Sequence, residues 1–452
     1  MLRGILVIEH AMRRPHTLRP STLSAFALAV TCTLLASAAS ARAQEEPRSV
    51  THEEAIRLAL ERSPIAVAAR GDTRVAEAGV LEARGSWLPF LSANSTYSNS
   101  SNERFDQSTG QLVSESYTAQ LAASYDVFTG GRKIARWQTA SASLRAAEAR
   151  ERGQRYATIL ETTQIFYQAA AAEELLAAAR QRLTRATRQQ EFAETRRLIG
   201  TATRSDALRA ELEQADAELA VLDAESQLRS SRLALGRQIG RPGAVRPQAG
   251  ALPEEPPAIP TVSVLVERAE SNAPDAVAAR AELDRASSEK REAWGQYVPS
   301  LRLTGGYDWF SFRWPPDEES WSLRLTASLP LFNGFTREAT LARAEAERRT
   351  AEAEARDAVL ASRAAVEDAA GQVDTAARRV EIARRALDLA REDLRVIEER
   401  YQLGAATILD LQTSQIALAD AEIGWVRARQ ELGVAVAALE AELGEPLARI
   451  GR

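Results

Sequence analysis

The sequence predicts a mainly α-helical protein with a small β part, in which one structural plan occurs twice. Three observations lead to this fold class. Residues 132–198 and 337–403 contain no proline and only one glycine each, as very long helices require. Residues 90–128 and 300–332 alternate apolar and polar side chains with the period of two that is typical of strands. The two halves also match when one is shifted along the other, which indicates an internal repeat.

Composition restricts the classes of function that the chain can have. Its 452 residues carry 57 Lys and Arg against 62 Asp and Glu, a formal net charge of −5. Proteins that bind nucleic acid usually carry a basic domain or patch, so we expect no nucleic-acid partner. One Cys and three His leave little material for zinc sites, disulfide frameworks or Cys–His nucleophile pairs. We therefore expect a protein that is not an enzyme, with no cofactor and no metal site.

The N-terminal residues 1–43 are typical of a secretory signal peptide. Arg13, Arg14 and Arg19 form a basic region ahead of an apolar stretch at 25–38, and residues 41–43 match the A-x-A pattern of a cleavage site. The alternative is an uncleaved membrane anchor, but the stretch is shorter than the ~20 apolar residues of a spanning helix. The sequence leaves open whether translation starts at Met1 or Met12.

Two repeats follow, at 44–240 and 261–452, with a linker at 241–260 between them. Each repeat is expected to contain a helix, a β-hairpin, a long helix, a tight turn and a returning helix. A shift of 210 residues aligns the beginnings of the repeats, and a shift of 204 aligns Phe128 with Phe332 and the segments that follow them. The linker contains six prolines, which predict a stiff and extended segment.

The two hairpins, 90–128 and 300–332, have the pattern of transmembrane strands. Their alternation extends over about 9–11 residues, which suits one face toward lipid and the other toward a lumen. An ordinary half-buried antiparallel sheet is the alternative. Four strands cannot close a barrel, because single-chain barrels begin at about eight, so closure requires several protomers. Aromatic residues that we expect at the membrane interface, or else as core anchors, are Trp309, Trp314, Trp321, Phe128 and Phe332.

The long helices 132–198 and 337–403 each contain 67 residues, roughly 100 Å at 1.5 Å per residue. Apolar residues recur every seven positions in the second helix and in the helix that returns from it. This pattern predicts antiparallel coiled-coil packing across the short turns 199–206 and 404–410. If the helices alone are considered, a plain coiled-coil scaffold is the alternative. The heptad positions are Val366, Val373, Val380, Leu387, Leu394 and Tyr401, and then Leu411, Leu418, Trp425, Leu432 and Leu439.

Four motifs resemble those of the TolC-like outer-membrane efflux and secretion channel family, or outer membrane factors. The resemblance covers nearly all of the chain after the signal peptide. Two motifs are the turns between long helices, and two are the passages from the second strand of a hairpin into a long helix. They lie at 198–206, 401–411, 126–131 and 329–334.

The resemblance implies a homotrimer in which a long coiled-coil α-helical barrel continues into a transmembrane β-barrel. It implies a location in the cell outer membrane with an extension into the periplasm. The function would be passive transmembrane transport, as the porin-like exit duct of a tripartite efflux pump or a type I secretion system. The implied partners are outer-membrane lipid, a periplasmic adaptor (membrane fusion) protein and an inner-membrane pump of the RND, ABC or MFS type. A periplasmic coiled-coil adaptor or structural tether is the alternative.

The resemblance also assigns residues to a periplasmic gate. Tyr401 matches the family's linking tyrosine, and Asp206 and Ser205 match its partners in the first hairpin of helices. The linking arginine of the family is replaced here by Ala406. We therefore expect a looser gate than in the full version of the pattern.

Asp410 matches the first aspartate of the family's aspartate ring, whereas Thr413 stands where the second would be. Three symmetry-related carboxylates at a constriction concentrate cations, and their repulsion is expected to raise their pKa values. The alternative is that Asp206 and Asp410 cap the returning helices, and the two roles are compatible.

The two tip turns, defined as 199–206 and 404–410, are the expected docking sites for the adaptor. Glycine can adopt a positive φ at a helix end, so Gly200 and Gly404 are expected to be turn residues first and docking contacts second. Thr203 and Thr407 complete the expected docking set.

Overall fold

The computed structural model describes residues 49–106 and 109–449. The predicted signal peptide lies outside the described residues. Within the described ranges, no helix combines the length and the apolarity that crossing a membrane demands.

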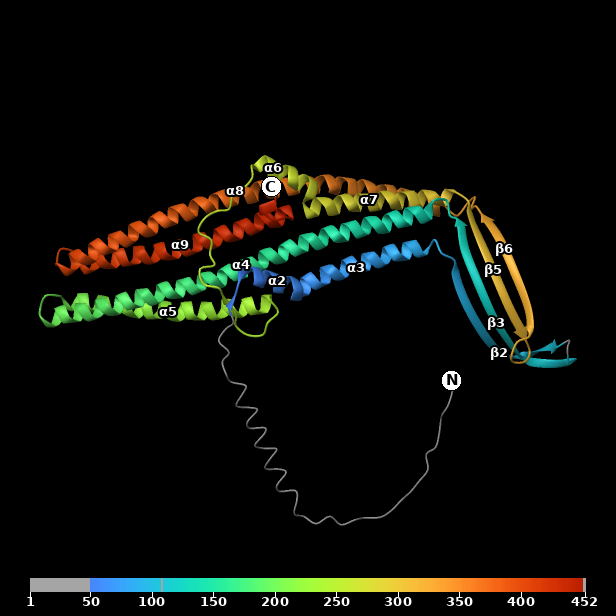
Figure 1. The fold of residues 1–452 in the computed structure, drawn as a ribbon, viewed down its shortest axis with the longest axis horizontal. Coiled ribbons are helices and arrows are strands. Elements are labelled where there is room, and N and C mark those ends of the chain that lie inside the picture. Colours follow the sequence, from blue (N-terminus) through green and yellow to red (C-terminus); the bar gives the residue numbers. More distant parts are fainter. Residues whose placement is uncertain (1–48, 107–108, 450–452) are drawn as a thin grey trace, which may run out of the picture. The chain divides into compact units, whose positions relative to one another are not determined.

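The first repeat contains four helices and two long strands (Figure 1). The strands are longer than the 9–11 residues expected, because pairing resumes past an irregularity between Asn99 and Arg104 and continues to Asp106, opposite Gln111. The elements are α2 (His52–Arg62), α3 (Pro64–Gly85), β2 (Phe90–Asp106), β3 (Gln111–Phe128), α4 (Arg132–Leu198) and α5 (Arg204–Gln238).

The second repeat follows the same order of elements. Its long helix has 67 residues, as α4 does, and begins one residue before the expected start. The elements are α6 (Val262–Asn272), α7 (Pro274–Trp294), the 3-10 turn η2 (Gly295–Tyr297), β5 (Ser300–Ser311), β6 (Glu318–Ser328), α8 (Thr336–Gln402), α9 (Ile408–Leu443) and η3 (Leu447–Arg449). The predicted fold class, mainly α with a small β part and two internal repeats, is confirmed.

The four long strands form one antiparallel sheet in the order β2-β3-β5-β6. The central pair, β3 and β5, joins the hairpin of the first repeat to that of the second, with Leu121 opposite Tyr307. Strands β2 and β6 are therefore the edges, and each has one unpaired side in the single chain. Two further short strands, β1 (Ser49–Val50) and β4 (Arg246–Pro247), pair in parallel and attach the linker to the start of the described chain.

The heptad positions of α8 and α9 form a buried seam. Every position of the row from Val366 to Tyr401 is buried, and Leu411, Leu418, Leu432 and Leu439 of α9 pack against it. Alanines at intervening positions, such as Ala369 and Ala376, bring the two helices close together. Helices α8 and α9 therefore form the expected antiparallel coiled coil.

Helix α4 connects the two repeats, since it packs against α5 of its own repeat and against α7 and α9 of the other (Figure 1). The contact with α9 is close at Gly433, where a Cβ atom would lie 2.3 Å from the Tyr167 ring. Only glycine leaves room for this ring.

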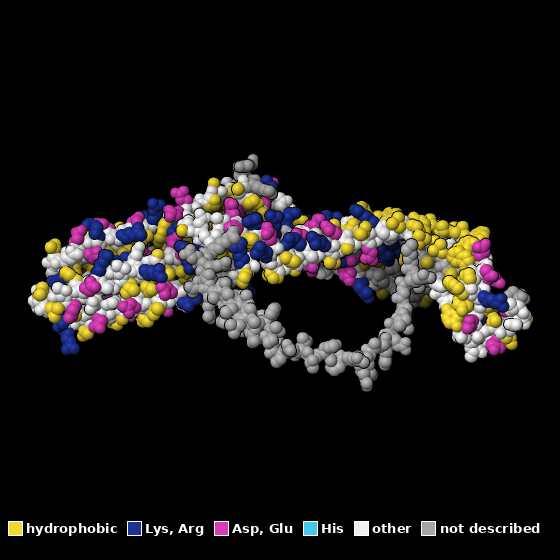
Figure 2. Space-filling model, turned by 60° about the horizontal axis from the view of Figure 1, so that its bottom comes forward, with side chains coloured by type: hydrophobic (Ala, Val, Ile, Leu, Met, Phe, Trp, Pro, Cys, Tyr) yellow, Lys and Arg dark blue, Asp and Glu magenta, His cyan; other side chains and the backbone are white. Residues whose placement is uncertain are grey.

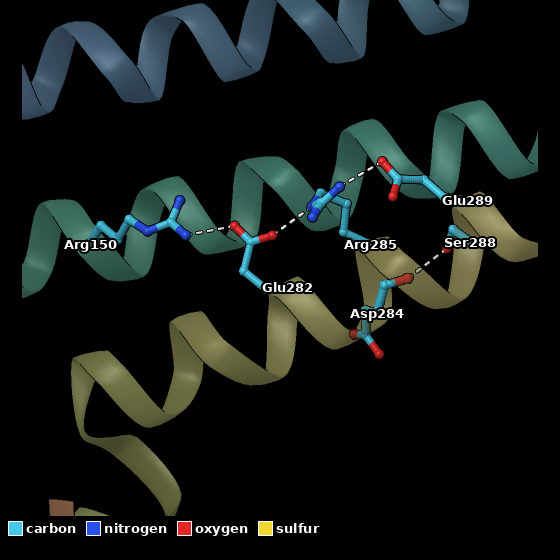
Figure 3. A network of polar contacts seen from close by, with 6 residues as sticks. All are labelled: Arg150, Glu282, Asp284, Arg285, Ser288 and Glu289. Carbon is cyan, nitrogen blue, oxygen red and sulfur yellow. Dashed lines mark hydrogen bonds and ion pairs between the residues drawn. The ribbon is translucent and has the colours of Figure 1, made fainter. Parts of the chain in front are cut away.

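A network of charged side chains links α4 to α7 (Figure 3). Arg150 of α4 donates to Glu282 of α7 at 2.6 Å, and Arg285 donates to Glu282 at 2.5 Å and to Glu289 at 2.6 Å. Burial alone raises the pKa of Glu282, but the hydrogen bonds from Arg285 and Arg150 bring that pKa below its usual value. Glu282 therefore stays charged and holds the two helices together.

A buried arginine fixes the Pro-rich linker across both repeats. The guanidinium of Arg429, in α9, donates to Glu174 of α4 and to the Leu252 carbonyl of the linker, both at 2.8 Å. It also lies 5.3 Å from the centre of the Trp425 ring. One side chain thus joins α4, α9 and the linker.

Candidate functional site

The candidate site lies where the long helices turn, at the two tip turns. In the first turn the Thr203 amide donates to the Asp206 carboxylate at 3.0 Å, and the Asp206 amide donates to the Thr203 hydroxyl at 3.2 Å. In the second, Thr407 and Asp410 make the same pair of hydrogen bonds, at 2.8 and 3.2 Å. Each turn therefore carries a reciprocal capping box at the start of the returning helix.

These hydrogen bonds affect the charge of Asp410. The backbone amide and then the hydroxyl of Thr407 hold the pKa of Asp410 below its ordinary value, because they stabilise the carboxylate. Repulsion within a ring of carboxylates would instead raise this pKa, as the sequence predicts for the assembled protein. Within one chain the pKa of Asp410 is lowered, because the capping hydrogen bonds form inside the chain, whereas the repulsion arises only between copies.

The glycines of the two turns have the expected left-handed backbone. Gly200 has φ 77° and Gly404 has φ 75°. The chain then closes each helix end, where the Thr201 amide donates to the Arg196 carbonyl at 2.9 Å and the Ala405 amide donates to the Arg400 carbonyl at 2.8 Å.

Tyr401 lies buried between the two helical hairpins near the tip. Burial raises the pKa of its hydroxyl, with a small contribution from the Asp206 carboxylate in the same direction, whereas a hydrogen bond with Gln189 and the charge of Arg196 oppose the rise. Among the described residues, however, no hydrogen bond joins Tyr401 to Asp206 or to Ser205, because the Asp206 carboxylate is directed to Thr203. Thr413, expected at the ring, donates within its own helix to the Leu409 carbonyl at 2.9 Å.

The sequence did not identify Arg196 as a gate residue, yet it links the two helical hairpins. This residue, in the last turn of α4, donates from Nη1 to the Tyr401 backbone carbonyl at 3.2 Å. Its guanidinium lies 5.5 Å from the Tyr401 ring and 5.6 Å from the Phe192 ring. The available signal was Phe192 one helical turn before an arginine, at the end of the helix that faces Tyr401.

A second hydrogen bond between the hairpins lies one turn beyond the tip. The Gln412 side chain of α9 donates to the Arg209 carbonyl of α5 at 3.2 Å. The two hairpins of a single chain are thus connected from both sides of the tip turns.

The sheet forms the second part of the candidate site, and the predicted interface aromatic residues lie at its two ends. Phe128 and Phe332 are close to the helices, whereas Trp309, Trp314 and Trp321 are near the far ends of the strands. All except Trp309 are exposed; Trp309 is half-buried and packs on Tyr307, with ring centres 4.6 Å apart.

The two faces of the sheet differ in chemistry. Leu323 and Leu325 of β6 are exposed on one face, and hydrophobic side chains gather over the sheet and the neighbouring helix ends (Figure 2). On the opposite face of the sheet, Arg302 of β5 pairs with Asp126 of β3 at 2.7 Å. An exposed apolar face opposite a charged one suits a sheet between lipid and water.

Comparisons with known proteins agree with this geometry. The family model described as outer membrane efflux protein matches residues 55–241 and 265–445. A search of curated protein sequences gave no match.

Solved structures share the fold over most of the chain. The outer membrane protein VceC of Vibrio cholerae is 20% identical, with 88% of this chain and 96% of that chain covered and a TM-score of 0.74. The MtrE outer membrane channel of Neisseria gonorrhoeae is 23% identical, with 88% and 89% covered and a TM-score of 0.74. The CmeC outer membrane channel of Campylobacter jejuni is 15% identical, with 88% of each chain covered and a TM-score of 0.73.

Proposed function

Because this chain belongs to the outer membrane efflux protein family, we propose that it is the outer-membrane exit duct of a tripartite efflux pump or a type I secretion system. Members of this family are transport channels rather than enzymes. The duct passes solutes passively from the periplasm or an inner-membrane pump to the exterior. The observation that carries this proposal is a sheet with one apolar face and two unpaired edges, continuous with two 67-residue helices.

A homotrimer closes the sheet. The free edge of β2 in one copy pairs with the free edge of β6 in the next, so that three chains with four strands each form a barrel. A periplasmic tether would have no use for such strands, so this observation favours the duct.

The helices support the same assembly. Helix α8 exposes an apolar row at seven-residue spacing, outside the seam with α9, and α5 exposes leucines at helical spacing. Helix α4 already packs against α9 within the chain, so α5 and α8 are the helices left to meet the neighbouring copies. The exposed residues are Ile382, Leu389, Val396 and Leu403 of α8, and Leu208, Leu212, Leu219 and Leu222 of α5.

The tip turns form the periplasmic gate in this assembly. Asp410 contributes one carboxylate per copy to a ring that concentrates cations, while Arg196 and Tyr401 hold the two hairpins of each copy together. The adaptor docks on the exposed turns around Gly200, Thr203, Gly404 and Thr407, and the adaptor connects the duct to a pump of the RND, ABC or MFS type.

The test is single-channel conductance of the detergent-purified protein in a planar bilayer, at low and high salt. We expect small, cation-preferring steps whose preference falls in the Asp410→Asn variant, which loses the charge but keeps an acceptor for Thr407. Asp374→Asn, an exposed carboxylate in the middle of α8, is the matched control and is expected to keep the preference. A protein that leaves the membrane fraction in high salt without detergent would instead support the tether.

A further inference from the structure

Helices α4 and α9, which come from different repeats, meet in two specific contacts. The Tyr167 ring of α4 fills the space beside Gly433 of α9, where a Cβ atom would overlap the ring. One helical turn before Gly433, the guanidinium of Arg429 donates to the Glu174 carboxylate of α4 at 2.8 Å. The two repeats are therefore joined here by a large side chain over a glycine and by an ion pair.

The repeats match position by position in this region, so each residue of the two contacts has an equivalent. The shift of 204 residues places Thr203 on Thr407, and these threonines are the N-caps of α5 and α9, each with a capping box. The same shift places Gly240 on Gly444, which follow the ends of the two helices with φ 65° and 64°. The shift thus holds along the whole length of the returning helices.

The equivalent residues lie on α8 and α5, and their chemistry is exchanged. Where α4 has the large ring, α8 has a glycine, and where α9 has the glycine, α5 has a large side chain. The charges are reversed in the same way, from glutamate on α4 to arginine on α8 and from arginine on α9 to glutamate on α5. The α8 and α5 positions therefore complement each other as the α4 and α9 positions do. The equivalent residues are Gly371 for Tyr167, Arg229 for Gly433, Arg378 for Glu174 and Glu225 for Arg429.

Gly371 and Arg229 are both open to solvent in the single chain. Gly371 is the single glycine of the 67-residue helix α8, where glycine is unfavourable, and no atom lies within 4 Å of the place where its Cβ would be. Arg229 is exposed and makes no hydrogen bond or ion pair with any residue that the structure describes. Helices α8 and α5 share no extended packing within the described chain. The opening at Gly371 is therefore available to a side chain from another copy.

Arg378 and Glu225 have only surface partners within the chain. Arg378 pairs with Asp374 of its own helix at 3.0 Å, and Glu225 pairs with Arg180 of α4 at 2.7 Å. Ion pairs at the surface contribute little to stability, so both side chains are free to turn toward a more closely packed partner.

We propose that Arg229 of one copy lies over Gly371 of the next copy, and that Glu225 of the first copy pairs with Arg378 of the second. This inference rests on the proposed trimer and names the residues that join its α5 and α8 surfaces. Each chain then makes the same kind of contact on both sides, through α4 and α9 inside the chain and through α8 and α5 between chains. The two contacts lie at equivalent positions along the long helices, so they fix the height of each copy relative to the next.

The exchange of size and charge also specifies which helices meet. If this face of α4 met α5 of another copy, Tyr167 would collide with Arg229 and two glutamates would face each other. If this face of α8 met α9 of another copy, two glycines would leave a void and two arginines would face each other. Only the combinations α4 with α9 and α8 with α5 are complementary in both respects.

Cross-linking of cysteines tests the placement of Arg229 over Gly371. The full-length protein carries Arg229→Cys and Gly371→Cys with Cys32→Ser as background, and a short bifunctional thiol reagent is added to membranes that contain it. We expect linked dimers and trimers of chains on a denaturing gel, and single chains from either cysteine variant alone. Absence of linked chains, in a protein that still forms a trimer in detergent, would overturn the contact and leave the duct intact. A wild-type protein that is monomeric in detergent would contradict the proposed assembly together with the contact.

Charge reversal tests the ion pair between copies. Glu225→Arg and Arg378→Glu each place like charges opposite one another, so we expect each to lower the trimer population in detergent several-fold at low salt. Together they restore an opposite pair with the polarity that the α4 and α9 contact has, and we expect the trimer to return to the wild-type level. Asp223→Arg, an exposed charge reversal on α5 outside the pair, is the matched control and is expected to keep the trimer. A double variant with no more trimer than the single variants would overturn the pair.

A size exchange tests the opening at Gly371. Gly371→Tyr fills the opening and is expected to lower the trimer population several-fold, whereas Gly371→Tyr with Arg229→Gly reproduces the α4 and α9 contact and is expected to recover it. Gly424→Tyr, at an equally open glycine of α9, is the control and is expected to keep the trimer. Equal trimer populations in the Gly371→Tyr variant and the wild type would show that no side chain of another copy occupies this opening.

Discussion

At the scale of the residue, the carboxylate of Asp410 has one role within its own chain and a second, proposed role between copies. It caps α9 through the Thr407 amide and hydroxyl, and in the proposed trimer it also faces its two symmetry mates. The cap lowers its pKa and the ring raises it, so the two effects oppose one another. The cap therefore keeps the proposed ring charged at pH values where bare repulsion would begin to protonate it.

The cap predicts a dependence of stability on pH. Since the folded pKa of Asp410 lies below its ordinary value of 3.8, the stabilisation is fully present above that value and is lost as the pH falls through the folded pKa. We expect wild type to melt at a higher temperature than Asp410→Asn at about pH 7, and the difference to close toward about pH 3. Thermal denaturation followed by circular dichroism measures this. If the difference in melting temperature between wild type and Asp410→Asn stayed the same in acid, the ionised Asp410 carboxylate would not be what stabilises the cap.

The contacts of Arg196 predict that its replacement changes the gating of the proposed duct. Replacement by alanine removes the hydrogen bond to the Tyr401 carbonyl and the contacts with two rings, together worth about 1–2 kcal/mol. We expect the open population of the duct in a planar bilayer to rise by roughly tenfold. Arg197→Ala is the matched control, since Arg197 pairs with Glu194 in its own helix. Equal conductance of the two variants would show that Arg196 does not hold the gate closed.

At the scale of the element, the long helices were predictable because their causes are local. The absence of proline and the seven-residue rows of α8 and α9 depend only on neighbouring residues, and the rows are buried as expected except at Trp425, which is half-buried. The far end of β2 was not predictable, because its polar residues after Tyr97 become a strand only by pairing with β3, whereas its start at Phe90 was predicted. The link from Arg196 to Tyr401 was missed for a related reason, since it joins residues 205 positions apart through the packing of two hairpins.

The two apolar rows of α8 predict different effects when they are disrupted. Leu387 lies in the buried seam, whereas Leu389 is exposed in the row that is proposed to face another copy. We expect Leu389→Glu to lower the trimer population in detergent by at least about tenfold, because it places a charge in an apolar contact. Light scattering coupled to size-exclusion chromatography measures this. The control is Arg391→Glu, an exposed charge change outside the row, and equal loss of trimer in both would refute the interface.

At the scale of the whole molecule, the two repeats are joined in three ways. They share one sheet, α4 packs against α7 and α9, and Arg429 attaches the linker to both halves. The shared sheet and the packing of α4 are extended surfaces. Arg429 is a single side chain, which can be replaced without altering the sheet or the helix packing.

Arg429→Ala is expected to loosen the linker selectively. It leaves the Leu252 carbonyl and the Glu174 carboxylate without their partner, at a cost of about 2–3 kcal/mol. Limited proteolysis of the trimer is expected to cut within 241–260 several-fold faster than in wild type. Exposed Arg427→Ala, two residues away, serves as the control. Unchanged cleavage would show that the prolines alone hold the segment.

The order of the strands has a consequence for stoichiometry. Each chain contributes an even number of antiparallel strands, so β6 of one copy always runs opposite to β2 of the next, however many copies join. Rings of two, three or four chains all allow antiparallel pairing between neighbouring copies. The sheet therefore does not determine how many chains assemble. In the proposed assembly, the number of chains is then set by the angle at which α5 of one copy meets α8 of another. Changing the size of the pore by design would therefore begin with those helix faces rather than with the strands.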